Sequence, residues 1–167
     1  VVTLDQERGK LGFAWFPGKR LVVTEKASYM LGEAGISALD RETYPAASNR
    51  RKQVAKKREA LMALKPRPEN YEDQLKAIEA EESDVERQLE ECTLFDYEDE
   101  DLEAMVIGGE QLFAAGMNKV VCLDRQTGQE LWKERIEGTA RGLAVAGGRL
   151  FASTEDGKVC CFSSGTR

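Results

Sequence analysis

The stretch that decides the fold runs from Val120 to Trp132 and reads VVCLDRQTGQELW. Its Leu-Asp phrase recurs along the chain, and the three copies span residues 4–9, 39–43 and 123–128. Each copy closes a run of alternating apolar residues, which is the pattern of a half-buried strand. A recurring unit of this kind indicates that one structural module is used several times.

Short apolar runs alternate with Gly, Asn and Asp turns in the second half of the chain. The pattern predicts strands at residues 104–107, 111–115, 119–124 and 130–133, with turns at 108–110, 116–118 and 125–128. A second unit of the same plan covers residues 142–162, and an earlier one covers 12–40. When about 45 residues of the charged helical segment between the last two copies are left out, the period is about 40, which is typical of four-stranded propeller blades.

The same residues resemble the quinoprotein-type, or PQQ-like, β-propeller repeat. In that family a strand ends in Leu-Asp, and Thr-Gly and Leu-Trp follow at fixed spacing. The resemblance rests on positions in two copies and on two turn glycines: Leu39, Asp40, Leu123, Asp124, Thr127, Gly128, Trp132, Gly148 and Gly157. The copy at residue 39 departs from the pattern where Tyr44 and Pro45 replace the glycine.

The resemblance implies a mainly β chain with a partial β-propeller of about two to three four-stranded antiparallel blades. In such blades the Asp and Thr-Gly residues build a tight turn, and the Trp packs between adjacent blades. We therefore interpret Asp40, Asp124 and Thr127 as turn residues that accept backbone hydrogen bonds, in preference to catalytic carboxylates. Trp132 and Trp15 are interpreted as core between blades, in preference to a cofactor platform.

Between the β segments the sequence pattern changes to that of helices. One helix is expected from Ser48 or Asn49 to Leu64, and a second begins at Asn70 as N-cap, with Asp73 in a capping-box-like position. Apolar residues fall at heptad positions in both helices: Ala47, Val54, Leu61, Leu75, Ile78, Val85, Leu89 and Cys92. The pattern predicts an antiparallel coiled-coil hairpin that projects as a finger. The predicted division is residues 1–45 and 96–167 for the β parts and 46–95 for the hairpin.

The first helix is basic and the second acidic, so opposite charges are expected to flank the seam. Two interpretations remain open: a hairpin whose charges satisfy one another, or a docking arm in which Arg50, Arg51, Lys56 and Lys57 contact a partner. The acidic run Asp96–Asp101 is expected to be a solvated return linker. It lacks the glycine and ligand spacing of a calcium-binding EF-hand loop.

Composition excludes several classes of site. A net charge of −6 argues against a nucleic-acid binder, and the absence of histidine removes the commonest general base and metal ligand. The four cysteines show no C-x-x-C spacing, which argues against zinc. Cys160 and Cys161 should point to opposite faces of a strand. A Cys122–Cys161 disulfide, or a vicinal one like that of some alcohol dehydrogenases, stays open.

No apolar run is long enough to span a membrane. The chain starts without Met, without a signal-peptide pattern and inside a repeat, so we expect a fragment of a longer protein. The family resemblance implies the periplasm or cell envelope as its compartment.

The expected function is a non-catalytic propeller segment that acts as a scaffold or protein-binding module, without a cofactor. The alternative is a fragment of a PQQ- and calcium-dependent dehydrogenase, or of an enzyme whose catalytic part lies elsewhere. We find no position in the sequence for that family's calcium ligands. Open sheet edges favour self-association, by edge pairing or by exchange of residues 1–11.

Overall fold

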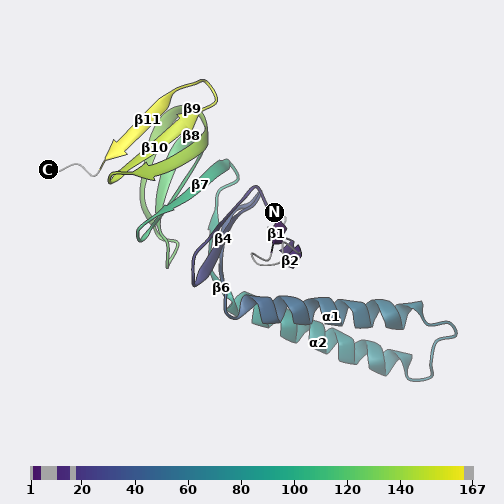
Figure 1. The fold of residues 1–167 in the computed structure, drawn as a ribbon. Coiled ribbons are helices and arrows are strands. Elements are labelled where there is room, and N and C mark those ends of the chain that lie inside the picture. The colour runs from purple at the N-terminus through teal and green to yellow at the C-terminus, as the bar shows by residue number, and fades with distance from the viewer. Residues whose placement is uncertain (1, 5–10, 16–17, 164–167) are drawn as a thin grey trace. The chain divides into compact units, whose positions relative to one another are not determined.

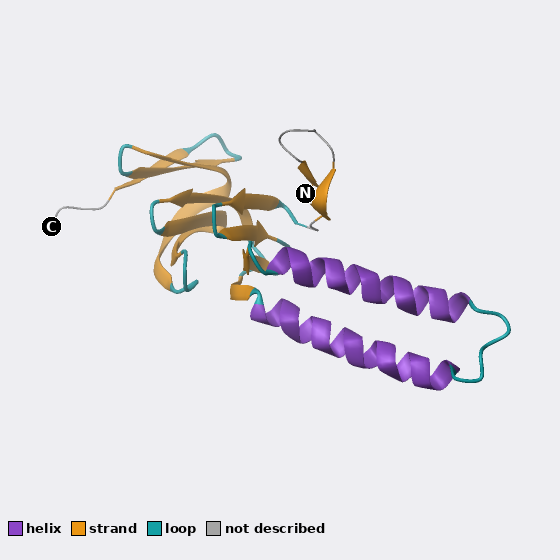
Figure 2. Ribbon diagram, turned by 60° about the horizontal axis from the view of Figure 1, so that its bottom comes forward, coloured by secondary structure: helices purple, strands orange, loops and turns teal. Residues whose placement is uncertain are grey.

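The computed structural model describes residues 2–4, 11–15 and 18–163, and gives side chains for residues 18–163. The chain forms two compact units, one made of Val1–Leu39 with Leu94–Arg167 and the other of Asp40–Thr93. The first unit holds antiparallel sheets and the second a pair of helices (Figures 1 and 2). The fold is therefore mainly β, as predicted. Most of the first Leu-Asp copy, residues 5–9, lies outside the described residues.

A four-stranded antiparallel sheet forms from the earlier part of the chain and one strand beyond the helices. Its strands are β3 (Arg20–Val23), β4 (Ala27–Leu31), β5 (Gly35–Asp40) and β6 (Thr93–Glu98), in the order β3-β4-β5-β6. Burial alternates along β4, because successive side chains point to opposite faces. Two further strands, β1 (Val2–Leu4) and β2 (Leu11–Trp15), pair antiparallel with each other, and their side chains, including that of Trp15, lie outside the described part of the chain.

The five strands after residue 101 form an antiparallel meander in chain order. They are β7 (Leu102–Gly108), β8 (Gln111–Asp124), β9 (Glu130–Ala146), β10 (Arg149–Thr154) and β11 (Val159–Ser163). The first part of β8 pairs with β7, and its second part pairs with β9. In the same way β9 pairs first with β8 and then with β10. Each of the two long strands therefore changes its pairing partner along its length.

The predicted turn at residues 116–118 is wrong, because β8 runs through it without a break. Met117 pairs with Thr139 but Lys119 pairs with Arg135, so the register shifts there, and Asn118 has φ +57°. Between these two pairs β8 advances by two residues and β9 by four, so the two extra residues lie on β9. The predicted gap between residues 133 and 142 is likewise continuous strand in β9.

The irregular backbone at Asn118 decides which side chains of β8 reach each core. Before it, the even-numbered Leu112 and Ala114 face the core between the two sheets, whereas after it the odd-numbered Val121 and Leu123 do. If side chains alternated without interruption through Asn118, one half of β8 would present its apolar side chains to the wrong face. The residues that suggested a turn instead allow one strand to serve two cores.

The first core lies between the two sheets. It joins β4 and β5 to β7 and β8 through buried side chains such as Leu31, Ile36, Leu102 and Leu112. The second core joins β8 to β10: Phe113, Val120 and Cys122 pack with Leu150 and Ala152. Burial raises the pKa of the Cys122 thiol to about 11. The five-stranded sheet therefore carries a core on each of its faces.

The helices are α1 (Tyr44–Ala63) and α2 (Tyr71–Glu91). Helix α1 begins four residues before the predicted Ser48, because Pro45 is tolerated in a first turn, where its missing N–H is not needed. Asn70 holds the N-cap position of α2, but its side chain accepts a hydrogen bond from the Gln74 side chain and does not cap the backbone. The predicted capping box therefore does not form.

The helix pair has a core of its own. Val54 and Leu61 of α1 pack with Tyr71, Ile78 and Val85 of α2, so each helix contributes residues seven apart. The ion pairs Arg50–Asp84 and Lys57–Glu81, both 2.6 Å, run in opposite directions along the two helices. The helices are therefore antiparallel, with opposite charges beside the seam, as predicted. A coiled-coil supercoil stays a prediction.

The acidic run is not the solvated linker that we predicted. Asp96 and Glu98 belong to β6, and the Asp99 side chain is only 9% exposed. Lys119 lies 2.6 Å from Asp99 and 3.2 Å from Asp101. Burial alone would lower the pKa of Lys119, but its hydrogen bonds to these carboxylates outweigh burial and raise it.

All four cysteines are free thiols. Cys160 packs against the second core whereas Cys161 is exposed, so the two lie on opposite faces of β11. Neither of the disulfides that the sequence left open is formed.

Candidate binding groove

The two described Leu-Asp copies fold into the same turn. The amides of Gln126 and Thr127 donate to Asp124 Oδ1 at 2.9 and 2.8 Å, and the Thr127 hydroxyl donates at 2.9 Å. In the other copy, Glu42 N, Thr43 N and Thr43 Oγ1 donate to Asp40 Oδ1 at 2.9, 2.8 and 2.9 Å. We call these the Asp124 turn (Asp124–Gly128) and the Asp40 turn (Asp40–Thr43).

These hydrogen bonds stabilise the ionised carboxylates. The Thr43 amide and hydroxyl lower the pKa of Asp40, and the Thr127 amide and hydroxyl lower that of Asp124. Both carboxylates therefore stay charged near neutral pH, and their acceptor capacity is used to hold the turn. The geometry supports a structural role for both residues.

The helix pair is inserted between Thr43, the last residue of the Asp40 turn, and Cys92. In the Asp124 turn, the Asp124 amide donates to Gln129 O at 2.8 Å, whereas the Asp40 amide donates to Cys92 O at 2.9 Å. Cys92 thus takes the place of Gln129, and residues 44–91 stand where the other copy has Gly128. The turn closes in the same way although a helix pair has been added to it.

The equivalence continues into the next strand. Leu94 and Phe95 of β6 correspond to Leu131 and Trp132 of β9, and both leucines are similarly exposed, 45% and 48%. The sequence analysis did not identify Leu94 and Phe95 as the continuation of the second Leu-Asp copy after the helices. The Leu-Phe pair directly after the acidic helix was the signal that could have revealed it.

Each copy also carries an aromatic pair. The rings of Tyr29 and Phe95 are 6.3 Å apart and inclined at 47°, and those of Phe113 and Trp132 are 6.1 Å apart and inclined at 49°. Tilted pairs at this separation are favourable ring contacts. We refer to them as the first and the second aromatic pair.

The Asp124 turn covers the first aromatic pair. The Tyr29 hydroxyl donates to Arg125 O at 3.0 Å, and a Cβ on Gly128 would come within 2.4 Å of the Phe95 ring. The Tyr97 hydroxyl donates to Glu130 Oε2 at 2.7 Å, just after that turn. Burial, more than this carboxylate, raises the pKa of Tyr97. Three side chains of the four-stranded sheet thus contact the Asp124 turn or Glu130 just beyond it.

The second aromatic pair lines a groove of about 980 Å³ in the five-stranded sheet. Trp132 is half-buried, and its ring lies 5.9 Å from that of Phe162 on β11. Trp132 therefore packs against a neighbouring repeat while one side faces the groove. The groove is lined by Gly108, Gly109, Gln111, Phe113, Trp132, Glu134, Val145, Gly148, Arg149, Leu150, Cys161, Phe162 and Ser163.

The other repeat residues lie where a turn or a strand end requires them. Leu39 and Leu123 are buried at the ends of β5 and β8. Gly148 and Gly157 have φ of +71° and +79°, which glycine adopts readily. Gly148 also lines the groove.

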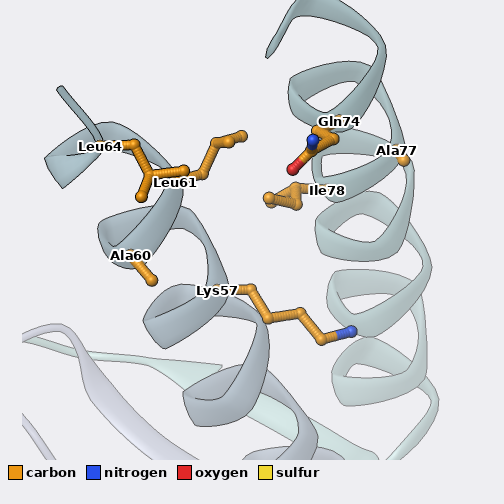
Figure 3. A pocket seen from close by; sticks show the side chains of 7 residues that line it. All are labelled: Lys57, Ala60, Leu61, Leu64, Gln74, Ala77 and Ile78. Atoms are coloured by element: carbon orange, nitrogen blue, oxygen red, sulfur yellow. The ribbon is translucent and has the colours of Figure 1, made fainter. Parts of the chain in front are cut away.

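A second hollow of about 470 Å³ lies between the two helices. Figure 3 shows Leu61 and Leu64 of the α1 end facing Ile78 and Gln74 of α2. Of the predicted partner-binding residues, Arg50 and Lys57 are taken up by Asp84 and Glu81. Arg51 and Lys56 are exposed, and no described ion pair includes them.

Within the described ranges, no three or more Cys, Asp or Glu side chains gather as metal ligands would. No helix there combines the length and apolar character needed to cross a membrane.

Comparison with known proteins gives two kinds of match. A sequence profile of the family described as outer membrane protein assembly factor BamB matches residues 79–167, more than half of the 167-residue chain. Curated proteins give no match. Residues 79–167 include the Asp124 turn and both strands that carry the second aromatic pair.

Two solved structures share the fold. BamB from Moraxella catarrhalis matches with a TM-score of 0.53 and 16% identity, over 98% of this chain and 37% of that chain. The computationally designed Ika4 protein matches with a TM-score of 0.54 and 9% identity, over 87% of this chain and 64% of that chain. The chain thus spans about a third of BamB and under two thirds of Ika4. With its profile match and its repeated Asp turns, the chain belongs to the PQQ-like repeat family of the outer membrane protein assembly factor BamB.

Proposed function

We propose that the chain is a non-catalytic segment of a PQQ-like β-propeller, acting as a scaffold or protein-binding module. The helix pair, as a coiled-coil hairpin, is its docking arm. The observation that carries the proposal is the Asp40 turn, which closes with the same hydrogen bonds as the Asp124 turn despite the insertion. Because the repeat can close its turn without an insertion, the helix pair adds a new surface to it. Inserted surface segments of this kind commonly bind partners.

The family name supports a role in assembly. A relative described as an outer membrane protein assembly factor works with other proteins, and the chain's compartment would then be the periplasm or cell envelope. On α1 of the arm, Arg51 and Lys56 are exposed and stand outside the described ion pairs. We assign them the contact with an acidic protein partner.

The test places a photo-crosslinking amino acid at Arg51 or Lys56 in cells that make the protein. The expected result is one discrete protein adduct at both positions. The control position is Ser83, exposed on α2, which should give none. Adducts of equal yield at Ser83, or no adduct from α1, would remove the docking role.

The competing proposal is a fragment of a PQQ- and calcium-dependent dehydrogenase, or of an enzyme whose catalytic part lies elsewhere. It is tested by adding PQQ and calcium to the protein. We expect no thermal shift and no dye-linked alcohol oxidation. A clear shift with both ligands together, absent with calcium alone, would favour the dehydrogenase.

A further inference from the structure

The hollow between the two helices is an apolar surface on an otherwise highly charged pair. Leu61 and Ile78 form its floor and are 4% and 8% exposed. Ala60 and Ala77 form its rims: both are exposed, and in Figure 3 they lie on the outer sides of α1 and α2. Leu64 also lines the hollow and is 48% exposed, so part of this apolar surface is uncovered.

Polar side chains close the hollow at both ends. Toward the base of the helices, Lys57 Nζ lies 2.6 Å from Glu81 Oε2. Toward the loop, the Gln74 side chain donates to Asn70 Oδ1 at 2.7 Å. Because these groups already bind one another, the middle of the hollow offers apolar contacts to an occupant.

The walls of the hollow are suited to a helix. On each wall the lining residues are spaced three and four apart, as on one face of a helix. A third helix packs its own ridges between such rows, and the alanines on the two rims allow it to come close. An extended segment would leave backbone N–H and C=O groups unpaired there, because the backbone groups of α1 and α2 are bonded within their own helices.

Charges beside the hollow specify the flanks of that helix. Lys56 lies one turn before Ala60 on α1, and Asp73 lies one turn before Ala77 on α2. Lys56 and Asp73 are exposed, and no ion pair described for these helices includes them. A complementary helix therefore carries an acidic residue on its α1 side and a basic residue on its α2 side.

We propose that the hollow binds an amphipathic helix of a partner protein, whose apolar stripe lies between one acidic and one basic flank. This inference rests on the proposed docking role of the helix pair and names the element that the arm binds. A helix that is acidic on both flanks would pair with Lys56 but would also meet Asp73 and the acidic α2.

The test uses blocked 21-residue peptides made of Ala, Leu, Glu and Lys. Each has Leu at the first and fourth positions of every heptad, and the flanks are Glu and Lys, Glu on both sides, or Lys on both sides. By calorimetry at low salt, we expect saturable binding of the mixed peptide, about threefold or more tighter than of the other two. Lys56→Glu should transfer the preference to the peptide with Lys on both flanks.

Two exposed alanines of α2 make a matched pair of variants. Ala77 lines the hollow and Ala80 does not. Ala77→Arg should weaken binding of the mixed peptide at least about tenfold, whereas Ala80→Arg should stay within about twofold. Both variants add one positive charge and keep a good helix former, so circular dichroism should show an unaltered helix content.

Several results would overturn the proposal. One is the absence of saturable binding of the mixed peptide up to about 1 mM. Others are equal losses in Ala77→Arg and Ala80→Arg, and equal binding of all three peptides. A dimer that Ala77→Arg dissociates and Ala80→Arg does not would make a second copy the occupant. Co-sedimentation with phosphatidylglycerol vesicles, lost in Ala77→Asp but kept in Ala80→Asp, would make it a lipid surface.

The photo-crosslinking result at Lys56 separates this inference from the docking role. An adduct at Lys56 without peptide binding would keep the docking arm and remove only the hollow as its binding site. Peptide binding without any adduct would remove the docking arm, and with it the inference.

Discussion

At the scale of single residues, one carboxylate organises each turn by accepting three hydrogen bonds. Asp40 and Asp124 do so with the same three distances, although different structures come after them. The local sequence Asp-x-x-Thr is therefore sufficient to form the turn. After the threonine the chain continues into α1 in one copy and into β9 in the other.

Gly128 is the residue at which the turn meets its neighbour. It has φ +73°, and a Cβ there would lie 2.4 Å from Phe95. Gly109 has a similar φ of +62° but nothing within 4 Å. We expect Gly109→Ala to lower the free energy of unfolding by about 1–2 kcal/mol through backbone strain alone. Gly128→Ala should cost at least about 1 kcal/mol more through overpacking.

Chemical denaturation of both variants measures this difference. Equal losses would mean that the contact between the Asp124 turn and Phe95 does not contribute to stability. A larger loss for Gly109→Ala would contradict this packing.

The Asp turns also predict a pH dependence. The folded state lowers the pKa of Asp40 and Asp124 below the unfolded value of about 3.9. Their stabilisation is therefore complete above that value and is lost as pH falls through the folded pKa. Asp124→Asn keeps an acceptor but cannot be protonated in this way, so its melting temperature should fall less steeply below about pH 4.

Thermal melts of the wild type, Asp124→Asn and Asp40→Asn/Asp124→Asn give the comparison. The double variant should be flattest. If the melting temperature fell equally with decreasing pH in all three proteins, neither carboxylate would be linked to folding.

Residue-level prediction succeeded where the interaction is local. Asp40, Asp124 and Thr127 could be assigned from sequence because their partners lie two or three residues away. The turn predicted at Gly116 is wrong because a distant residue requires this glycine: a Cβ there would lie 1.7 Å from Asp101 O. The sequence around Gly116 contains no trace of that approach.

At the scale of elements, the long strands and the inserted helices both depart from the expected plan of four short strands. Near Asn118, β8 changes its partner from β7 to β9, and β9 carries two extra residues there. Asn118 Oδ1 accepts a hydrogen bond from Gly138 N at 3.1 Å. Strand identity was predictable from alternation, but strand continuity was not. Gly and Asn residues are favoured both in bulges and in tight turns, so their presence does not distinguish the two.

The helical insertion was predictable in type and antiparallel direction because its heptads and charges are internal to it. Its exact place in the repeat was not, since Cys92 replaces Gln129 only through the backbone bond that Asp40 makes across the insertion. The correspondence therefore needed coordinates, and it leads to a test of whether the helices are an addition.

Replacing residues 44–92 by Gly-Gln rebuilds the third copy's turn within the second copy. Because the Asp40 turn then has the plan of the Asp124 turn up to Thr93, we expect the sheets to fold without the helices. Circular dichroism should lose its helical signal and keep its β signal, with a cooperative melt. A control that joins Thr43 directly to Thr93 lacks the positive-φ glycine and should be less stable.

Loss of cooperative unfolding in the Gly-Gln variant would mean that the helix pair is needed for the fold. The docking-arm proposal would then lose the observation on which it rests.

At the scale of the whole molecule, repeat is joined to repeat through aromatic pairs and turns. Composition, the Leu-Asp period and the Trp position were enough to indicate the PQQ-like family, which the profile match confirms. The contact between the Asp124 turn and the first aromatic pair could not be foreseen, because it joins Tyr29 to Arg125, 96 residues further along the chain. Blade number stays a prediction.

The same arrangement predicts self-association at the sheet edge. β11 is the last strand in the order of its sheet, and Val159 on it is 69% exposed. Unpaired backbone groups beside an exposed apolar side chain are a template for another strand, and an edge lysine opposes such pairing. Val159→Lys should therefore shift sedimentation equilibrium toward monomer, whereas Met62→Lys, at a 61% exposed site on α1, should not. Both variants add one positive charge, so a matching shift in both would trace association to net charge. A shift confined to Met62→Lys would place the contact on the helices, and β11 would then be protected by something other than pairing.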